Sequence, residues 1–152
     1  MFREPLLFAA APAAAVIACL AAAGPAPGSE RLLRGPVEAR VISVIDGDTI
    51  RAAASVWPGN EVTVSVRIRG IDAPEMKSRC DAERRAALRA KSALEDIVGR
   101  GPVRLRDVGG GKYYGRVLAD VEAADGRAVG AALLSLDLVR PYGGGRRSPW
   151  CG

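Results

Sequence analysis

Histidine is absent from this sequence of 152 residues. Zinc hydrolases, nucleases with histidine metal ligands and enzymes with a histidine general base all require an imidazole, so these mechanisms are excluded within this chain. Any metal ion must then be held by oxygen atoms. Oxygen ligands favour Ca²⁺ or Mg²⁺.

Cysteine is also scarce, with three residues in the chain. Cys19 lies in an apolar N-terminal segment, whereas Cys80 and Cys151 lie in the remainder. Two cysteines left after removal of a leader suggest one disulfide formed in an oxidising compartment. A pair of reduced thiols is the alternative.

The charge is moderately basic, with 22 Lys and Arg against 17 Asp and Glu and a net charge of +5. A basic surface favours a polyanionic partner such as a nucleic acid. Many basic proteins bind no nucleic acid, so the charge alone does not decide the function.

The N-terminal residues 1–23 form an alanine-rich apolar run, and a Pro/Gly linker follows to residue 28. The run is too short and too rich in alanine for a membrane span, and its small-residue end predicts an export signal. Two alternatives are a retained anchor and a lipoprotein leader, because Val16–Cys19 is similar to a lipobox in which Cys19 is lipidated. We therefore expect an exported, periplasmic or secreted protein.

The remaining chain is expected to form one domain over residues 29–142, with an extended tail over residues 143–152. Alternating apolar residues predict five short strands, at 37–45, 50–54, 62–68, 103–106 and 117–121. Three- and four-residue spacing predicts a helix over 81–98 and a short one over 129–138. This order predicts an α+β, mainly-β fold, an OB-fold five-stranded partly open barrel with a helix inserted between strands 3 and 4 and a short C-terminal helix. Such barrels often carry nucleic acid on one side.

Charged residues gather in the stretch Arg67–Glu75, at the end of the third predicted strand. Two carboxylates, Asp72 and Glu75, stand there around a proline that stiffens the turn. Segments 46–49 and 113–116 add further carboxylates and a second arginine. Together these groups offer oxygen ligands for a hard cation and guanidinium groups for a phosphate beside it.

Each of these segments also has a purely structural interpretation. Asp46-Gly47 is a favoured hairpin turn, and the segment from Asp72 could cap a helix that begins near Pro74. The functional interpretation depends on all three segments falling at strand ends of one small barrel.

The same segments resemble the staphylococcal nuclease-like, or thermonuclease, family. The matching stretches are Ile45–Ile50, Val66–Glu75 and Tyr114–Ala119, in the order of that family. They extend over most of the region 37–142. The C-terminal end resembles exported bacterial members that pair a cysteine after the central motif with one at the C-terminus, which here implies a disulfide between Cys80 and Cys151.

The resemblance implies a Ca²⁺ site. Asp48 and Asp72 would be its carboxylate ligands, and the backbone carbonyl of Ala73 would supply a further oxygen atom. Asp46 would support these ligands without touching the ion.

The resemblance also implies catalytic and substrate-binding residues. Arg67 and Arg116 would bind the scissile phosphate, and Glu75 would act as the general base on a water molecule. Tyr114 and Tyr142 fall where the family contacts the nucleotide.

The resemblance thus implies an exported, Ca²⁺-dependent nuclease, expected to be a monomeric endonuclease that hydrolyses DNA or RNA with low sequence specificity and without a stable protein partner. One departure is Lys112, which replaces an aspartate that usually precedes the motif tyrosine by two residues. The alternatives are a non-catalytic OB-fold nucleic-acid-binding protein and an envelope interaction protein that binds Ca²⁺ or an anionic polymer. Loss of Arg67, Glu75 or Arg116 would have favoured the binding protein, and all three are present.

Overall fold

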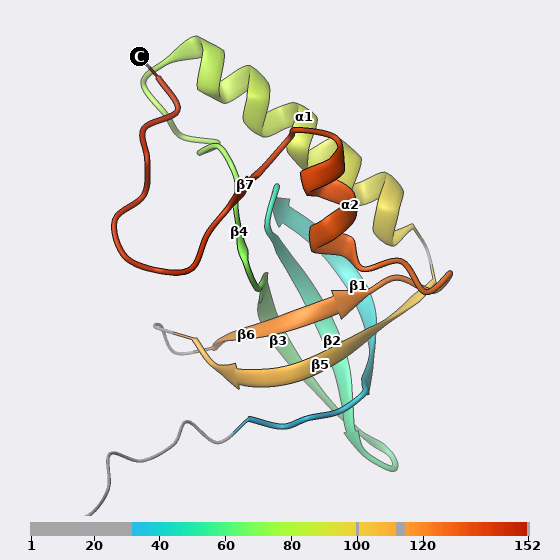
Figure 1. Ribbon diagram of the computed structural model, residues 1–152. Coiled ribbons are helices and arrows are strands. Elements are labelled where there is room, and N and C mark those ends of the chain that lie inside the picture. The colour runs from blue at the N-terminus through green and yellow to red at the C-terminus, as the bar shows by residue number, and fades with distance from the viewer. Residues whose placement is uncertain (1–31, 100, 112–114, 152) are drawn as a thin grey trace, which may run out of the picture.

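The computed structural model describes residues 32–99, 101–111 and 115–151 (Figure 1). The leader and linker expected over residues 1–28, including Cys19, therefore lie outside the described residues. Within the described ranges, no helix is long and apolar enough to cross a membrane.

Five strands form a closed barrel in the order β1-β2-β3-β6-β5 (Figure 1). The strands are β1 (Val37–Asp46), β2 (Thr49–Trp57), β3 (Asn60–Ile68), β5 (Pro102–Gly110) and β6 (Arg116–Glu122). All neighbouring strands are antiparallel except β3 and β6, which run parallel. The mainly-β, five-stranded fold predicted from the sequence is confirmed. The pairing of β1 with β5 closes the barrel that we expected to be partly open.

The alternating residues of β3 show how the sequence places a charged side chain at the barrel edge. Val66 and Ile68 are fully buried in the core, and Arg67 between them is on the opposite face of the strand. Each buried aliphatic side chain stabilises the fold by about 1.5–3 kcal/mol. The core therefore fixes which way Arg67 faces.

Two helices lie over the same end of the barrel (Figure 1). The first, α1 (Asp81–Val98), follows the third strand as predicted, and its residues Ala87, Ala90 and Leu94 are fully buried. The second, α2 (Val129–Ser135), is shorter than the predicted helix over 129–138. Asp137 has a φ of 54°, in the left-handed region, so a helix cannot continue through it.

Strand β5 is longer than the predicted 103–106, because part of the glycine-rich segment belongs to it. Gly109 and Gly110 pair with Leu118 and Val117 of β6. A bulge separates this pairing from the first part of β5, and Asp107 within it has a φ of 46°. The bulge interrupts the alternation on which the sequence prediction depends.

A small two-stranded sheet lies outside the barrel, where β4 (Ile71–Asp72) pairs antiparallel with β7 (Arg140–Pro141). From β7 the C-terminal tail loops outward and returns to the start of α1 (Figure 1). There Cys151 forms a disulfide with Cys80, with an S–S distance of 2.17 Å, as the resemblance implied. This bond places the tail against the segment between β4 and α1.

Candidate active site

The turn between β1 and β2 carries the first carboxylate, Asp48, which is 2% exposed. The adjacent Gly47 is required by packing. A Cβ atom there would lie 2.6 Å from the Cβ of Ala90 in α1 and 2.9 Å from the Cβ of Ala73. The turn therefore sits tightly between α1 and the residue that follows β4, and this contact brings Asp48 next to the central motif.

Arg67 joins this carboxylate to the second one, Asp72 of β4, which is 4% exposed. Its Nη1 atom donates to Oδ1 of Asp48 at 2.7 Å, and its Nη2 atom contacts Oδ1 of Asp72 at 3.3 Å. Two carboxylates from separate segments are thus held around one guanidinium. The structure brings together three residues that the sequence singled out.

Further hydrogen bonds fix the Asp48 carboxylate. The hydroxyl of Thr49 donates to Oδ1 at 2.8 Å, and the backbone N–H of Ala73 donates to Oδ2 at 2.9 Å. Burial raises the pKa of Asp48 from 3.8 to about 6, while the neighbouring Arg67 guanidinium acts in the opposite direction. Burial therefore disfavours the ionised form of this carboxylate, whereas a positive charge beside it favours that form.

Asp46 supports the turn. Its Oδ1 atom accepts a hydrogen bond from the backbone N–H of Asp48 at 3.1 Å, a bond that bridges the turn. This contact is consistent with the supporting role that the resemblance implied.

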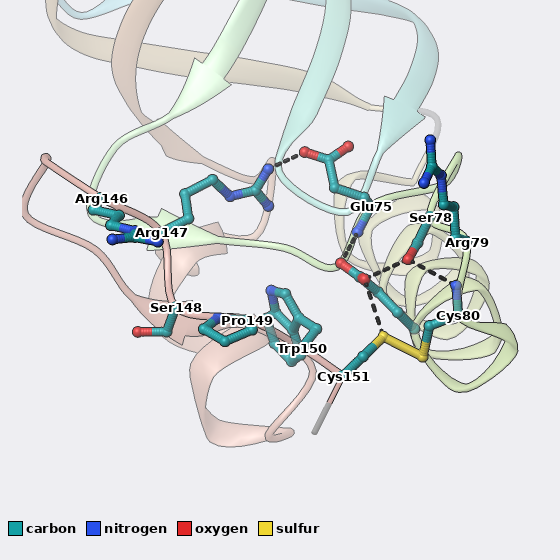
Figure 2. A pocket seen from close by; sticks show the side chains of 11 residues that line it. Glu75, Ser78, Arg79, Cys80, Arg146, Arg147, Ser148, Pro149, Trp150 and Cys151 are labelled. Carbon is teal, nitrogen blue, oxygen red and sulfur yellow. Dashed lines mark hydrogen bonds and ion pairs between the residues drawn. A yellow bond between two sulfur atoms is a disulfide. The ribbon is translucent and has the colours of Figure 1, made fainter.

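Glu75 lies after β4, and its side chain is 58% exposed. Its backbone N–H donates to Oε1 of Glu83 in α1 at 3.0 Å, which orients the loop. The carboxylate forms an ion pair with Arg147 of the C-terminal tail (Figure 2). Glu75 therefore faces the same side of the molecule as the tail.

Arg116 begins β6, and the parallel register pairs it with Ser65 of β3. In the next pairs Val117 lies opposite the buried Val66, so Arg116 is on the same sheet face as Ser65 and Arg67. The register therefore directs both predicted phosphate-binding arginines to one face of the barrel.

A family model described as staphylococcal nuclease homologue matches residues 65–141, about half of the chain. The chain belongs to the staphylococcal nuclease homologue family. No curated protein matches it. The matched region contains Arg67, Asp72, Glu75 and Arg116, and it begins after Asp48. Membership implies a nuclease that acts on phosphodiester bonds, with a nucleic acid as its substrate.

Members of this family typically depend on Ca²⁺, and the residues present fit such an ion. The carboxylates of Asp48 and Asp72 and the carbonyl of Ala73 form a set of hard oxygen donors, the kind that Ca²⁺ prefers. In the described part of the chain, no group of three or more His, Cys, Asp or Glu side chains is placed to hold a metal. The ion would therefore need the carbonyl and water molecules beside the two carboxylates.

The two predicted nucleotide-contacting tyrosines differ in what the structure describes. Tyr142 follows β7, where its backbone N–H donates to the carbonyl of Gly70 at 2.8 Å and its hydroxyl donates to the carbonyl of Gly145 at 2.7 Å. These bonds hold the base of the tail. Tyr114 lies outside the described residues, as does Lys112.

Sequence reasoning missed two residues of the tail that contact this nuclease-family site. Arg147 contacts Oδ1 of Asp72 through Nε at 2.6 Å and donates through Nη2 to the carbonyl of Ala73 at 2.6 Å. The indole N–H of Trp150 donates to Oδ2 of Asp72 at 3.3 Å. The one available signal was the expected disulfide, which brings the tail close to the segment after Glu75.

Proposed function

We propose that the protein is an exported, Ca²⁺-dependent nuclease that hydrolyses phosphodiester bonds of DNA or RNA with low sequence specificity. The observation that carries this proposal is the arrangement of Arg67 between the buried carboxylates of Asp48 and Asp72. It combines oxygen donors for a cation with a guanidinium for a phosphate. The disulfide supports an oxidising location outside the cytoplasm.

In this proposal Asp48, Asp72 and the Ala73 carbonyl hold the ion. When bound, Ca²⁺ would polarise a phosphoryl oxygen and offset the charge that develops on the phosphate. The two buried carboxylates are already positioned by hydrogen bonds, so little reorganisation is needed when charge develops.

Arg67 and Arg116 would bind the non-bridging oxygens of the phosphate. A phosphodiester attacked by water gathers negative charge on these oxygens, so guanidinium groups stabilise the transition state more than the ground state. The planar fork of arginine can grip two oxygens at once, and it stays charged at every working pH.

Glu75 would accept a proton from the attacking water. A bond then forms between the water oxygen and phosphorus while the bond from phosphorus to the leaving oxygen breaks, and the leaving oxygen takes up a proton from solvent water. A glutamate of ordinary pKa is ionised at neutral pH and can act in this way within hydrogen-bond reach of the water. Its exposed position beside the buried carboxylates suits this role.

The test is cleavage of single-stranded DNA, double-stranded DNA and RNA by the oxidised protein, with Ca²⁺ and with a chelator. We expect Ca²⁺-dependent cleavage that Glu75→Ser abolishes. Glu61→Ser is the matched control, because Glu61 is exposed at the β2–β3 hairpin and pairs with Arg40. Binding of all three nucleic acids without cleavage would replace this proposal with that of a non-catalytic OB-fold binding protein.

A further inference from the structure

The tail residues 146–151, which we call the strap, contact two of the proposed metal ligands, Asp72 and Ala73. Figure 2 shows Arg147 of the strap beside Glu75. The guanidinium of Arg147 contacts Oδ1 of Asp72, the carbonyl of Ala73 and the carboxylate of Glu75. These three groups comprise two proposed oxygen ligands and the proposed general base. Arg147 therefore places a positive charge where the proposed function places a cation.

The strap also occupies the second oxygen of Asp72. The indole N–H of Trp150 donates to Oδ2, while Arg147 and Arg67 share Oδ1. With the strap in this position, no oxygen of the buried Asp72 carboxylate is without a protein donor. A Ca²⁺ ion at this ligand would have to exchange with these donors.

Several contacts hold the strap in place. The guanidinium of Arg140 lies 3.9 Å from the centre of the Trp150 ring, and it donates to the carbonyl of Pro149 at 2.9 Å. The disulfide of Cys151 with Cys80 anchors its end to the start of α1. The strap is thus held by specific contacts along its length and by a covalent bond at its end.

The base and the surroundings of the strap allow Arg147 to move. Gly144 and Gly145 precede it with φ values of 103° and 87°, which glycine adopts without steric cost. The Arg147 side chain is 35% exposed, and it borders an open cavity of about 490 Å³ that Glu75 and Trp150 also line. A displaced guanidinium has room to swing into this cavity while the disulfide keeps the strap nearby.

We propose that the strap is an autoinhibitory element, in which Arg147 acts as a built-in counter-ion that Ca²⁺ must displace. This inference rests on the proposed function, because it assigns the same oxygens to the ion. A guanidinium with partly exposed ion pairs loses less on release than a buried one, so a divalent ion can replace it. Metal binding and release of Arg147 are then one event.

The test is calorimetric titration of Ca²⁺ into the oxidised full chain and two single variants. Arg147→Gln removes the competing charge, so we expect it to bind Ca²⁺ about tenfold more tightly than the wild type. Arg146→Gln is the matched control, because Arg146 is the exposed neighbour of Arg147 and makes none of these contacts. It removes the same charge from the same segment and should leave the affinity unchanged.

A second readout follows the strap directly. Trp57 is 73% exposed at the far hairpin, so a Trp57→Phe variant leaves Trp150 as the single indole. We expect Ca²⁺ to change the fluorescence emission of Trp150 in this variant. The Ca²⁺ concentration at half of the change should agree with the dissociation constant measured by calorimetry. An emission that stays constant while calorimetry shows binding would overturn the displacement.

The outcomes separate this inference from the proposed function. If the wild type binds Ca²⁺ and Arg147→Gln binds it with equal or lower affinity, the strap is not autoinhibitory. The nuclease proposal would be unaffected by that result. Binding by Arg147→Gln alone would support the strap strongly. Absence of Ca²⁺ binding in both proteins would overturn the proposed metal site and the strap with it.

Discussion

The two sides of the proposed active site are built in different ways. On the barrel side, Asp48 and Asp72 are buried and share the guanidinium of Arg67 from β3. On the tail side, Glu75 and Arg147 are more exposed and lie in irregular segments, the loop after β4 and the C-terminal tail. The first side is fixed by core packing, whereas the second is held by ion pairs and a disulfide. The buried charges are thus held by the core, and the more exposed charges are held by contacts that can be exchanged one at a time.

The largest loss of activity is expected for substitution of Arg67 on the barrel side. In Arg67→Lys we expect the turnover number at saturating Ca²⁺ to fall by about 10³-fold, because an ammonium group lacks the planar fork that grips two oxygens. Steady-state cleavage assays at saturating substrate measure this, with Arg89→Lys on the exposed face of α1 as the control. A rate near that of the wild type would remove Arg67 from the proposed mechanism.

The tail side depends on its disulfide. The double variant Cys80→Ser, Cys151→Ser should lower the free energy of unfolding by about 4 kcal/mol, since the bond restricts the unfolded chain over a sequence separation of 71 residues. Urea unfolding in the presence of a chelator measures this change. An unchanged midpoint and slope would show that the disulfide contributes nothing to the stability. Non-reducing peptide mapping of the wild type should recover the two cysteines together.

The buried carboxylates can be tested without touching the tail. Asp48→Asn preserves the shape of the side chain but removes one anionic ligand, so we expect Ca²⁺ affinity to fall about hundredfold. Calorimetry measures the affinity, with Asp120→Asn as the control because Asp120 is exposed and pairs with Arg69 at 3.6 Å. Equal losses in both variants would point to a general charge effect.

A change of pH should affect the barrel side through the carboxyl group of Asp48. Because the pKa of Asp48 is raised to about 6, protons compete with Ca²⁺ below that pH, and the affinity should fall by about tenfold per pH unit. The free energy of unfolding of the metal-free protein should have the opposite trend. The folded state holds the proton more tightly than the unfolded state, so this contribution is lost as the pH rises from about 4 to about 6.

Calorimetry and urea unfolding across this range measure both trends, and Asp48→Asn should flatten them. A Ca²⁺ affinity that is independent of pH between 5 and 7 would contradict the assignment of Asp48 as a ligand.

The sequence predicted the barrel side well for physical reasons. Alternation in β3 fixed the outward face of Arg67, and helical spacing placed the helix over residues 81–98, which α1 matches. Both patterns are local, so the sequence alone carries them. Where a local conformation interrupts a pattern, as at Asp107 and Asp137 with positive φ, the predicted boundaries of β5 and α2 were wrong.

The tail side could not be predicted in the same way. Arg147 follows a glycine-rich segment without periodicity, and its partners Asp72 and Glu75 lie more than seventy positions earlier in the chain. Such a contact depends on the tertiary path of the chain after β7. The expected disulfide predicted where the end of the tail lies. The contacts of Arg147 and Trp150 could be identified only from the structure.

The parallel pairing of β3 with β6 has a consequence for folding. A parallel pair cannot form from a tight hairpin, and here α1 and β5 lie between the two strands in the chain. Such distant pairings form slowly, because the entropy cost of closing a long loop precedes the free energy gained from the contacts. Arg67 and Arg116, the arginines that we assign to the phosphate, therefore stay apart until the barrel closes. In the proposed mechanism, a chain in which β3 and β6 have not yet paired lacks this pair of arginines and would not cleave nucleic acid.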